Sequence, residues 1–138
     1  MRFIITLVVL IISSCSAIET KPNVSMAFEK VKDQKFNALR SGDIFEVIKF
    51  DKTNGENLTV FGQNIYRFQY SMTVRFKLNA HSLFRDDLKN LITDAELKDE
   101  AKDHKYNFNI NNYYHYKSGQ LKEVKGCVEF KNTENGWQ

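Results

Sequence analysis

QNIYRFQYSMTVRFKL, at residues 63–78, is the stretch that decides the fold. From Tyr66 onward its side chains alternate strictly between apolar and polar. The even positions carry the apolar and aromatic set: Tyr66, Phe68, Tyr70, Met72, Val74, Phe76 and Leu78. Because successive side chains of a strand point to opposite faces, this period of two predicts a long strand with one buried face. A helix of the same composition would spread these residues around its whole surface.

The composition is that of one small globular domain. At 138 residues the chain has room for a single modest core. With 42% hydrophobic residues it is not of the disordered class. Twenty Lys and Arg face 17 Asp and Glu, and they are scattered along the chain without forming a basic stripe. We therefore expect no nucleic-acid partner, since phosphate binding needs clustered positive charge.

The first residues have the pattern of an export signal. Arg2 precedes an apolar run at residues 3–12, which has the length of a signal-peptide core and is too short to span a bilayer. The next residues, Ile12-Ser13-Ser14-Cys15, resemble the bacterial lipobox. That resemblance implies a signal peptide over residues 1–14, lipidation of Cys15, and a membrane anchor through this N-terminal lipid. Residues 15–22 then form a tether.

Two alternative processing sites in this signal peptide predict two different localisations. Lipidation of Cys15 predicts a protein anchored in the cell envelope, facing the periplasm or the cell surface. Cleavage after Ala17, a small-x-small site, would instead release a secreted soluble protein. After lipidation, Cys127 is the single remaining thiol, and its place in a strand-like run predicts a buried, inert side chain.

The rest of the chain, residues 23–138, reads as one α+β domain. An amphipathic helix is predicted from Asn23 or Ser25, as N-cap, to about Arg40, where Ser41-Gly42 stops it. A strand follows at residues 44–50, Asn54-Gly55 predicts a turn, and the chain extends again through residues 58–61.

The second half of the chain is also predicted to contain a helical segment followed by strands. Residues 81–104 carry a helical pattern that a capping box at residues 93–96 divides in two. Residues 106–116 and 121–131 alternate as two further strands, and Trp137 is expected to fold back over the open edge of the core. The order predicts an N-terminal helix packed on a curved antiparallel sheet of about four strands. A helical insertion lies between the second and third main strands.

This plan is that of cystatin-like and nuclear-transport-factor-2-like folds. Three segments resemble a group of small bacterial exported domains, often lipoproteins of the Bacteroidetes type: FEVIKFDKTNG (residues 45–55), FGQNIYRFQY (residues 61–70) and VKGCVEFKNTENGW (residues 124–137). The resemblance covers most of the sheet and none of the insertion. It implies a cystatin-like or nuclear-transport-factor-2-like sheet and brings no catalytic residue with it.

The sequence carries no motif of a known catalytic or metal site. His81, His104 and His115 show no ligand spacing, and we expect neither a metal nor a cofactor. No phosphate-binding loop, nucleophile elbow or zinc-protease motif is present. An enzyme is therefore the less favoured class.

Three functional hypotheses stay open. If Glu46 pointed into an apolar cone with tyrosines, it would be a general base for isomerase-like chemistry. Alternatively, four tyrosines in the buried phase of their strands would line a pocket for a small apolar ligand: Tyr66, Tyr70, Tyr106 and Tyr114. The third hypothesis is a domain that presents a sheet edge or the insertion to an envelope protein. The sequence leaves the oligomeric state open, including a homodimer.

Overall fold

A computed structural model describes residues 20–37, 39–104 and 106–138. The predicted signal peptide at residues 1–14, the lipidation site Cys15 and residues 16–19 of the tether lie outside these described residues. Within them, no helix combines the length and the apolar character needed to cross a membrane.

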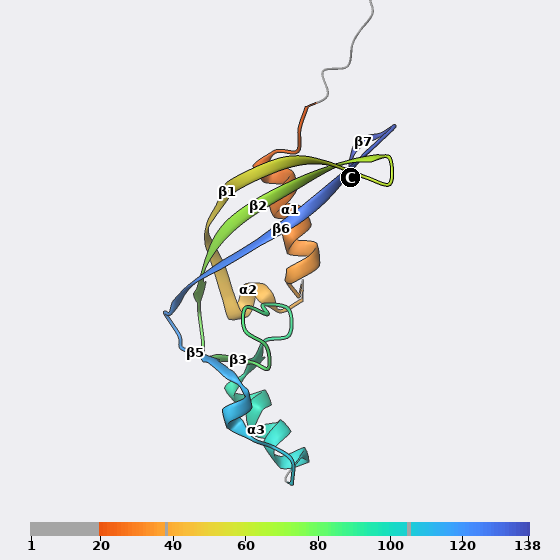
Figure 1. Cartoon of the computed structure of the whole chain (residues 1–138). Coiled ribbons are helices and arrows are strands. Elements are labelled where there is room, and N and C mark those ends of the chain that lie inside the picture. The colour runs from red at the N-terminus through yellow and green to blue at the C-terminus, as the bar shows by residue number, and fades with distance from the viewer. Residues whose placement is uncertain (1–19, 38, 105) are drawn as a thin grey trace, which may run out of the picture.

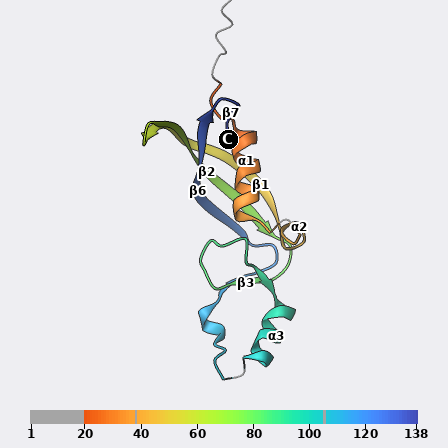
Figure 2. The same ribbon diagram turned by 90° about the vertical axis from the view of Figure 1, so that its right-hand side faces the viewer.

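The protein is an α+β fold built on a curled antiparallel sheet. Its four strands are β1 (Phe45–Val60), β2 (Gln63–Phe76), β6 (Leu121–Thr133) and β7 (Gly136–Trp137), in the spatial order β1-β2-β6-β7. Figure 1 shows the sheet as a half-barrel, and Figure 2 shows helix α1 (Val24–Lys35) lying along it. Ala27 and Val31 of α1 are fully buried in the shared core.

Strand β2 confirms the alternation read from the sequence. Its even-numbered side chains from Phe68 to Phe76 are buried against α1 and the neighbouring strands. From Arg67 to Arg75 the odd-numbered side chains lie on the outer face, and several of them pair across strands. Arg67 binds Glu129 through Nε and Nη2 at 2.9 and 2.8 Å, and Ser71 donates to Glu123 at 2.6 Å. The sheet therefore has one apolar and one polar face, as period two requires.

The turn of the first hairpin lies later than predicted. β1 continues through Asn54-Gly55 with a shift of register, and the chain reverses at Phe61-Gly62, where φ is 49° and 75°. The turn prediction at Asn54-Gly55 was wrong because of packing. The Tyr66 ring occupies the space above Gly55, where a Cβ would lie 2.0 Å from the phenol oxygen. Gly55 thus admits a ring inside a continuous strand.

Helix α1 begins and ends through identifiable contacts. Asn23 is the N-cap, and its Oδ1 accepts from the Met26 amide at 2.9 Å. The helix ends at Lys35, before the predicted boundary near Arg40, because Phe36 takes an extended conformation and packs edge-on against Phe45 at 5.1 Å. A short helix α2 (Ser41–Ile44) then leads into β1.

The insertion is a second, smaller sheet with one helix, whereas the sequence predicted helices over residues 81–104 and a strand over residues 106–116. It contains β3 (Ala80–Ser82), β4 (Ile92–Thr93), α3 (Asp94–Asp103), the 3₁₀ turn η1 (Ile110–Asn112) and β5 (Tyr114–Tyr116), with strand order β4-β3-β5. The predicted capping box is confirmed, since the Thr93 hydroxyl and the Glu96 carboxylate cap each other's backbone amides at the start of α3.

The helix predicted before this capping box is absent from the structure. Asp87 accepts hydrogen bonds from the amides of Lys89 and Asn90, and Asp86 has a φ of 64°. Such side-chain bonds compete with helical ones and hold the segment as a loop, from which Leu88 and Leu91 still reach the core. The strand predicted over residues 106–116 is likewise confined to its last three residues.

Two predictions about the end of the chain have opposite outcomes. Trp137 returns over the core as predicted, with its ring 6.0 Å from that of Tyr66. Cys127, however, is exposed, and the prediction of a buried thiol was wrong. β6 places Cys127 in the phase of Lys125 and Glu129, on the outer face, while Val124 and Val128 are buried.

Candidate functional site in the insertion

The four tyrosines predicted to line one pocket lie in separate places. Tyr66 and Tyr70 are buried on the concave face of the sheet, where Tyr70 stacks on Phe50 at 5.1 Å and Tyr66 accepts a 2.7 Å hydrogen bond from Lys52. Tyr114 is exposed on β5, and Tyr106 is 95% exposed in the loop after α3. The structure therefore brings Tyr66 and Tyr70 onto one face and leaves the other two on the surface of the insertion.

Glu46 lies on the outer face of β1. Its carboxylate forms an ion pair with Arg75 Nη1 at 3.2 Å, and the two residues are register partners. Tyr66 and Tyr70 belong to the opposite face of the same sheet. The structure therefore does not bring Glu46 together with these phenols.

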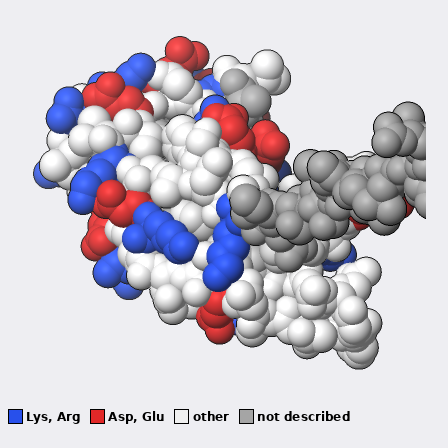
Figure 3. Space-filling model, turned by 90° about the horizontal axis from the view of Figure 1, so that it is seen from above, with Lys and Arg blue, Asp and Glu red and all other residues white. Residues whose placement is uncertain are grey.

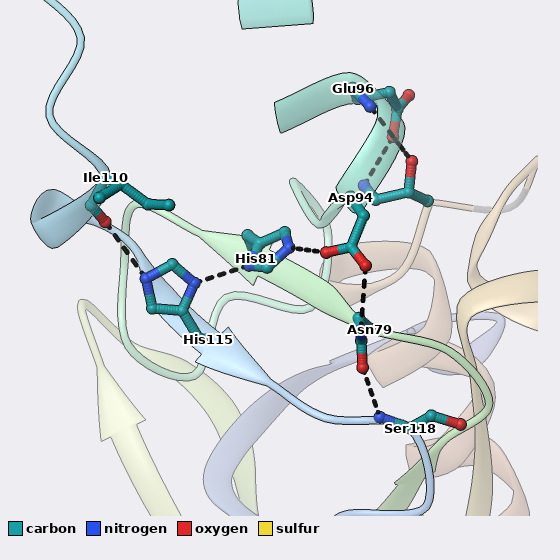
Figure 4. Close-up of polar contacts among 8 residues, drawn as sticks. Asn79, His81, Asp94, Glu96, Ile110, His115 and Ser118 are labelled. Carbon is teal, nitrogen blue, oxygen red and sulfur yellow. Dashed lines mark hydrogen bonds and ion pairs between the residues drawn. The ribbon is translucent and has the colours of Figure 1, made fainter. Parts of the chain in front are cut away.

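A different polar cluster connects three elements of the insertion. His81 on β3 is only 7% exposed, yet both of its ring nitrogens have partners. Nε2 contacts Asp94 Oδ1 at 2.6 Å, and Nδ1 contacts Nδ1 of His115 on β5 at 2.7 Å. Figure 4 shows these contacts, which continue from His115 Nε2 to the Ile110 carbonyl at 3.2 Å.

The carboxylate of Asp94 is held from two sides. Asn79 donates to its Oδ2 at 2.9 Å, and Asn79 is itself fixed by the Ser118 amide at 3.0 Å (Figure 4). The hydrogen bonds from Asn79 and His81, with a smaller contribution from the charge of Lys98, hold the pKa of Asp94 below its ordinary value. Asp94 is therefore an ionised hydrogen-bond acceptor at neutral pH.

Counting protons shows what this cluster can do. Its three hydrogen bonds use four ring nitrogens and two oxygens, those of Asp94 and Ile110, which only accept. Each bond needs one N–H, but two neutral imidazoles supply only two. All three bonds form together only when His81 and His115 share one additional proton beside the negative charge of Asp94. The exposed His115 ring connects this proton site to solvent.

The lowered pKa of Asp94 predicts a pH-dependent contribution to stability. A carboxyl group whose pKa is lower in the folded state stabilises that state fully above its ordinary pKa, about 3.9, and less as pH falls below it. We expect the loss of unfolding free energy in Asp94→Asn to be largest near neutral pH and to shrink on acidification, as measured by urea denaturation at a series of pH values. The matched control is Asp99→Asn, an exposed carboxylate on the same helix. An equal pH trend in both variants would contradict this prediction.

A cavity opens one residue beyond His81. Its volume is about 390 Å³, and it lies between the segment joining α1 to α2, the loop after β3, and α3. The apolar part of its wall comes from Leu83, Phe84, Leu91 and Ile92. The polar part includes Asn37, Arg40, Lys89, Asn90, Glu100 and Tyr113. This volume falls within the range of small-ligand sites.

Two pairs of charged or polar side chains hold this wall in place. Arg40 Nη2 donates to Glu96 at 2.6 Å; burial alone would raise the pKa of Glu96, but hydrogen bonds from Thr93 and Arg40 outweigh it and lower that pKa. The Tyr113 hydroxyl donates to Glu100, and this hydrogen bond raises the pKa of Tyr113. The charges of Arg40 and Glu100 are thus largely engaged within the protein.

Sequence reasoning missed both the histidine cluster and the cavity. His81 and His115 are 34 residues apart, so no short-range motif joins them. The signal available was the capping box, which fixes Asp94 as the first residue of α3. Within the described residues, no three His, Cys, Asp or Glu side chains are grouped so as to hold a metal ion. Comparisons of the chain with protein-family models, curated proteins and solved structures found no match.

Proposed function

We propose that this chain is a lipid-anchored protein of the cell envelope whose domain binds a small ligand without catalysing a reaction. The lipobox-like Ile12-Ser13-Ser14-Cys15 supports the anchor. We also propose that the domain is of the nuclear-transport-factor-2-like or cystatin-like type. The curled antiparallel sheet, with α1 packed along it, supports this finer assignment.

The observation that carries the binding function is the exposed apolar rim of the cavity. Leu83 is 51% exposed and Phe84 is 65% exposed, and both line the cavity. Two adjacent large apolar side chains are exposed to water at the mouth of the cavity. A ligand that covers them removes apolar surface from water, which makes binding more favourable. The buried Leu91 in the same wall would extend that apolar contact inward.

The charges of the wall indicate the chemical class of the ligand. Arg40 and Glu100 are engaged with Glu96 and Tyr113, while Lys89 adds a cation at the same wall. A ligand with an apolar body and one anionic group would pair with Lys89 and cover the rim. We therefore propose small amphipathic anions, such as aromatic or fatty carboxylates or sulfonates, as the ligand class.

Titration with 1-anilinonaphthalene-8-sulfonate tests this proposal, because the probe joins an apolar body to one anion. We expect saturable binding to the native protein, weakened about tenfold in Phe84→Ser, a loss near 1.4 kcal/mol that is typical of removing one apolar contact. Lys89→Ala is expected to weaken binding less and to remove most of its salt dependence.

The matched control is Leu121→Ser, which removes another exposed apolar side chain at the start of β6, one that does not line the cavity. Near-UV circular dichroism confirms that each variant keeps its packed core, since the probe also binds loosened proteins. Equal affinity in Phe84→Ser and Leu121→Ser would refute the cavity as the binding site.

A further inference from the structure

The tip of the first hairpin carries an aromatic residue that the fold does not require. Phe61 occupies the first position of the two-residue turn between β1 and β2, and its side chain is fully exposed. Its φ of 49° lies in the left-handed region, where glycine, asparagine and aspartate are favoured and a bulky side chain is strained. Phe61 therefore has unfavourable backbone geometry together with an apolar side chain in water.

The tip is also free of charge over a long stretch. No Asp, Glu, Lys or Arg occurs between Glu56 and Arg67. The end of β1, the two-residue turn and the start of β2 therefore carry no charged side chain. Val60, next to Phe61, is exposed as well. A tip without charged side chains avoids the large cost of moving a charge toward an apolar phase, and Val60 and Phe61 supply two apolar side chains there.

The start of the described chain lies beside this hairpin. Lys21 lines the same small pocket as Thr59 and Asn64, which form the second-last pair of the hairpin before the turn. Figure 1 shows the start of the described chain, before α1, and the hairpin tip at one end of the molecule, with α3 and the rest of the insertion at the other. Seen from that upper end, Figure 3 shows Lys and Arg interspersed with Asp and Glu, with no large area of one sign.

Chain length links this geometry to the proposed anchor. Cys15 precedes Thr20 by five residues, and five residues span at most about 18 Å. A lipid on Cys15 would hold the end of the molecule that carries the hairpin close to the bilayer surface. Lys21 beside the hairpin would favour anionic headgroups.

We propose that Val60 and Phe61 insert into the interfacial region of the bilayer and orient the domain, with the insertion and its cavity directed away from the membrane. This inference rests on the proposed lipid anchor. The bilayer explains Phe61 better than a protein groove does, because aromatic side chains gain free energy at the headgroup level without a shaped partner. The membrane contact of the Phe61 ring would then offset the cost of its left-handed backbone conformation.

The test uses the full chain, purified with its lipid and reconstituted into phosphatidylcholine–phosphatidylglycerol vesicles. In a Cys127→Ser background, Phe61→Cys is labelled with an environment-sensitive nitrobenzoxadiazole dye, and doxyl lipids serve as quenchers. We expect a blue-shifted emission that the doxyl lipids largely quench. The matched control is Lys117→Cys at the exposed turn before β6, at the far end of the sheet, where emission is expected to stay water-like and unquenched.

The outcomes separate this inference from the anchor on which it rests. Intact mass shows whether acyl chains are present on a chain beginning at Cys15, and Cys15→Ala is expected to remove both these chains and vesicle retention. Water-like emission at position 61 in a vesicle-bound, acylated protein would overturn the tip contact alone. The same labelled protein is also measured in native membranes. A blue-shifted emission at position 61 that is seen there and not in the lipid vesicles would assign the tip to a protein partner and overturn the bilayer contact. A chain without acyl groups would overturn the anchor and the tip contact together.

Discussion

Replacing Phe76 by alanine is expected to lower the free energy of unfolding by about 3–5 kcal/mol, the usual cost of removing a large aromatic side chain from a packed core. Phe76 is fully buried at the end of β2. Its ring stacks on that of Tyr116 at 4.6 Å, with the two planes within 4° of each other, and meets the Phe45 ring at 6.3 Å. The truncation would leave a cavity between these two rings.

This position is costly because it joins the two sheets. Phe76 belongs to the main sheet and Tyr116 to β5 of the insertion, so one side chain is packed between both parts. Urea denaturation followed by far-UV circular dichroism measures the loss. Phe84→Ala, which truncates an exposed phenylalanine in the insertion, is the matched control and is expected to change stability by less than about 0.5 kcal/mol. Similar losses in both variants would show that Phe76 does not couple the sheets.

Gly55→Ala is expected to destabilise the protein by about 1–3 kcal/mol, which is the cost of overpacking a filled site. The added Cβ would lie 2.0 Å from the Tyr66 phenol oxygen and 2.7 Å from its Cζ. Tyr66 cannot withdraw freely, because its ring is buried and packs against Trp137. Either the ring or the β1 backbone must therefore move.

Gly42→Ala is the matched control for this substitution. Gly42 lies in α2 with no atom within 4 Å of an added Cβ, and alanine there reduces the entropy of the unfolded chain. We expect that variant to be as stable as the parent or slightly more so. The decisive comparison is Gly55→Ala in a Tyr66→Ala background, where removing the ring should abolish most of the cost. A cost that persists there would assign the effect of Gly55 to the backbone.

The elements that depend on neighbouring residues were predictable from the chain alone. The alternation from Tyr66 to Leu78 predicted the strand, which ends at Phe76, and its buried face, since side-chain direction in a strand repeats every two residues. The capping box from Thr93 to Glu96 predicted where α3 begins, whereas the sequence offered both Asn23 and Ser25 as caps for α1 and the structure selects Asn23. These signals are local hydrogen bonds and periodicities, which the sequence states directly.

Tertiary packing decided what local preference left undetermined. Asn54-Gly55 favours a turn, but the Tyr66 ring packs on Gly55 and the strand continues to Val60. The helical pattern before Thr93 gave way to a loop, since its leucines reach the core without a helix. These outcomes depend on residues distant in sequence, whose contacts outweigh propensities of a few tenths of a kcal/mol per residue.

The candidate site shows the same division. The sequence by itself determined that Asp94 opens a helix and that three histidines are present. Only the pairing of β3 with β5 places His81 opposite His115, and only the folding of the insertion beside the α1–α2 segment forms the cavity. The physical reason is that a hydrogen bond between two rings needs atoms within about 3 Å, a distance that chain topology sets and that no spacing along the sequence encodes.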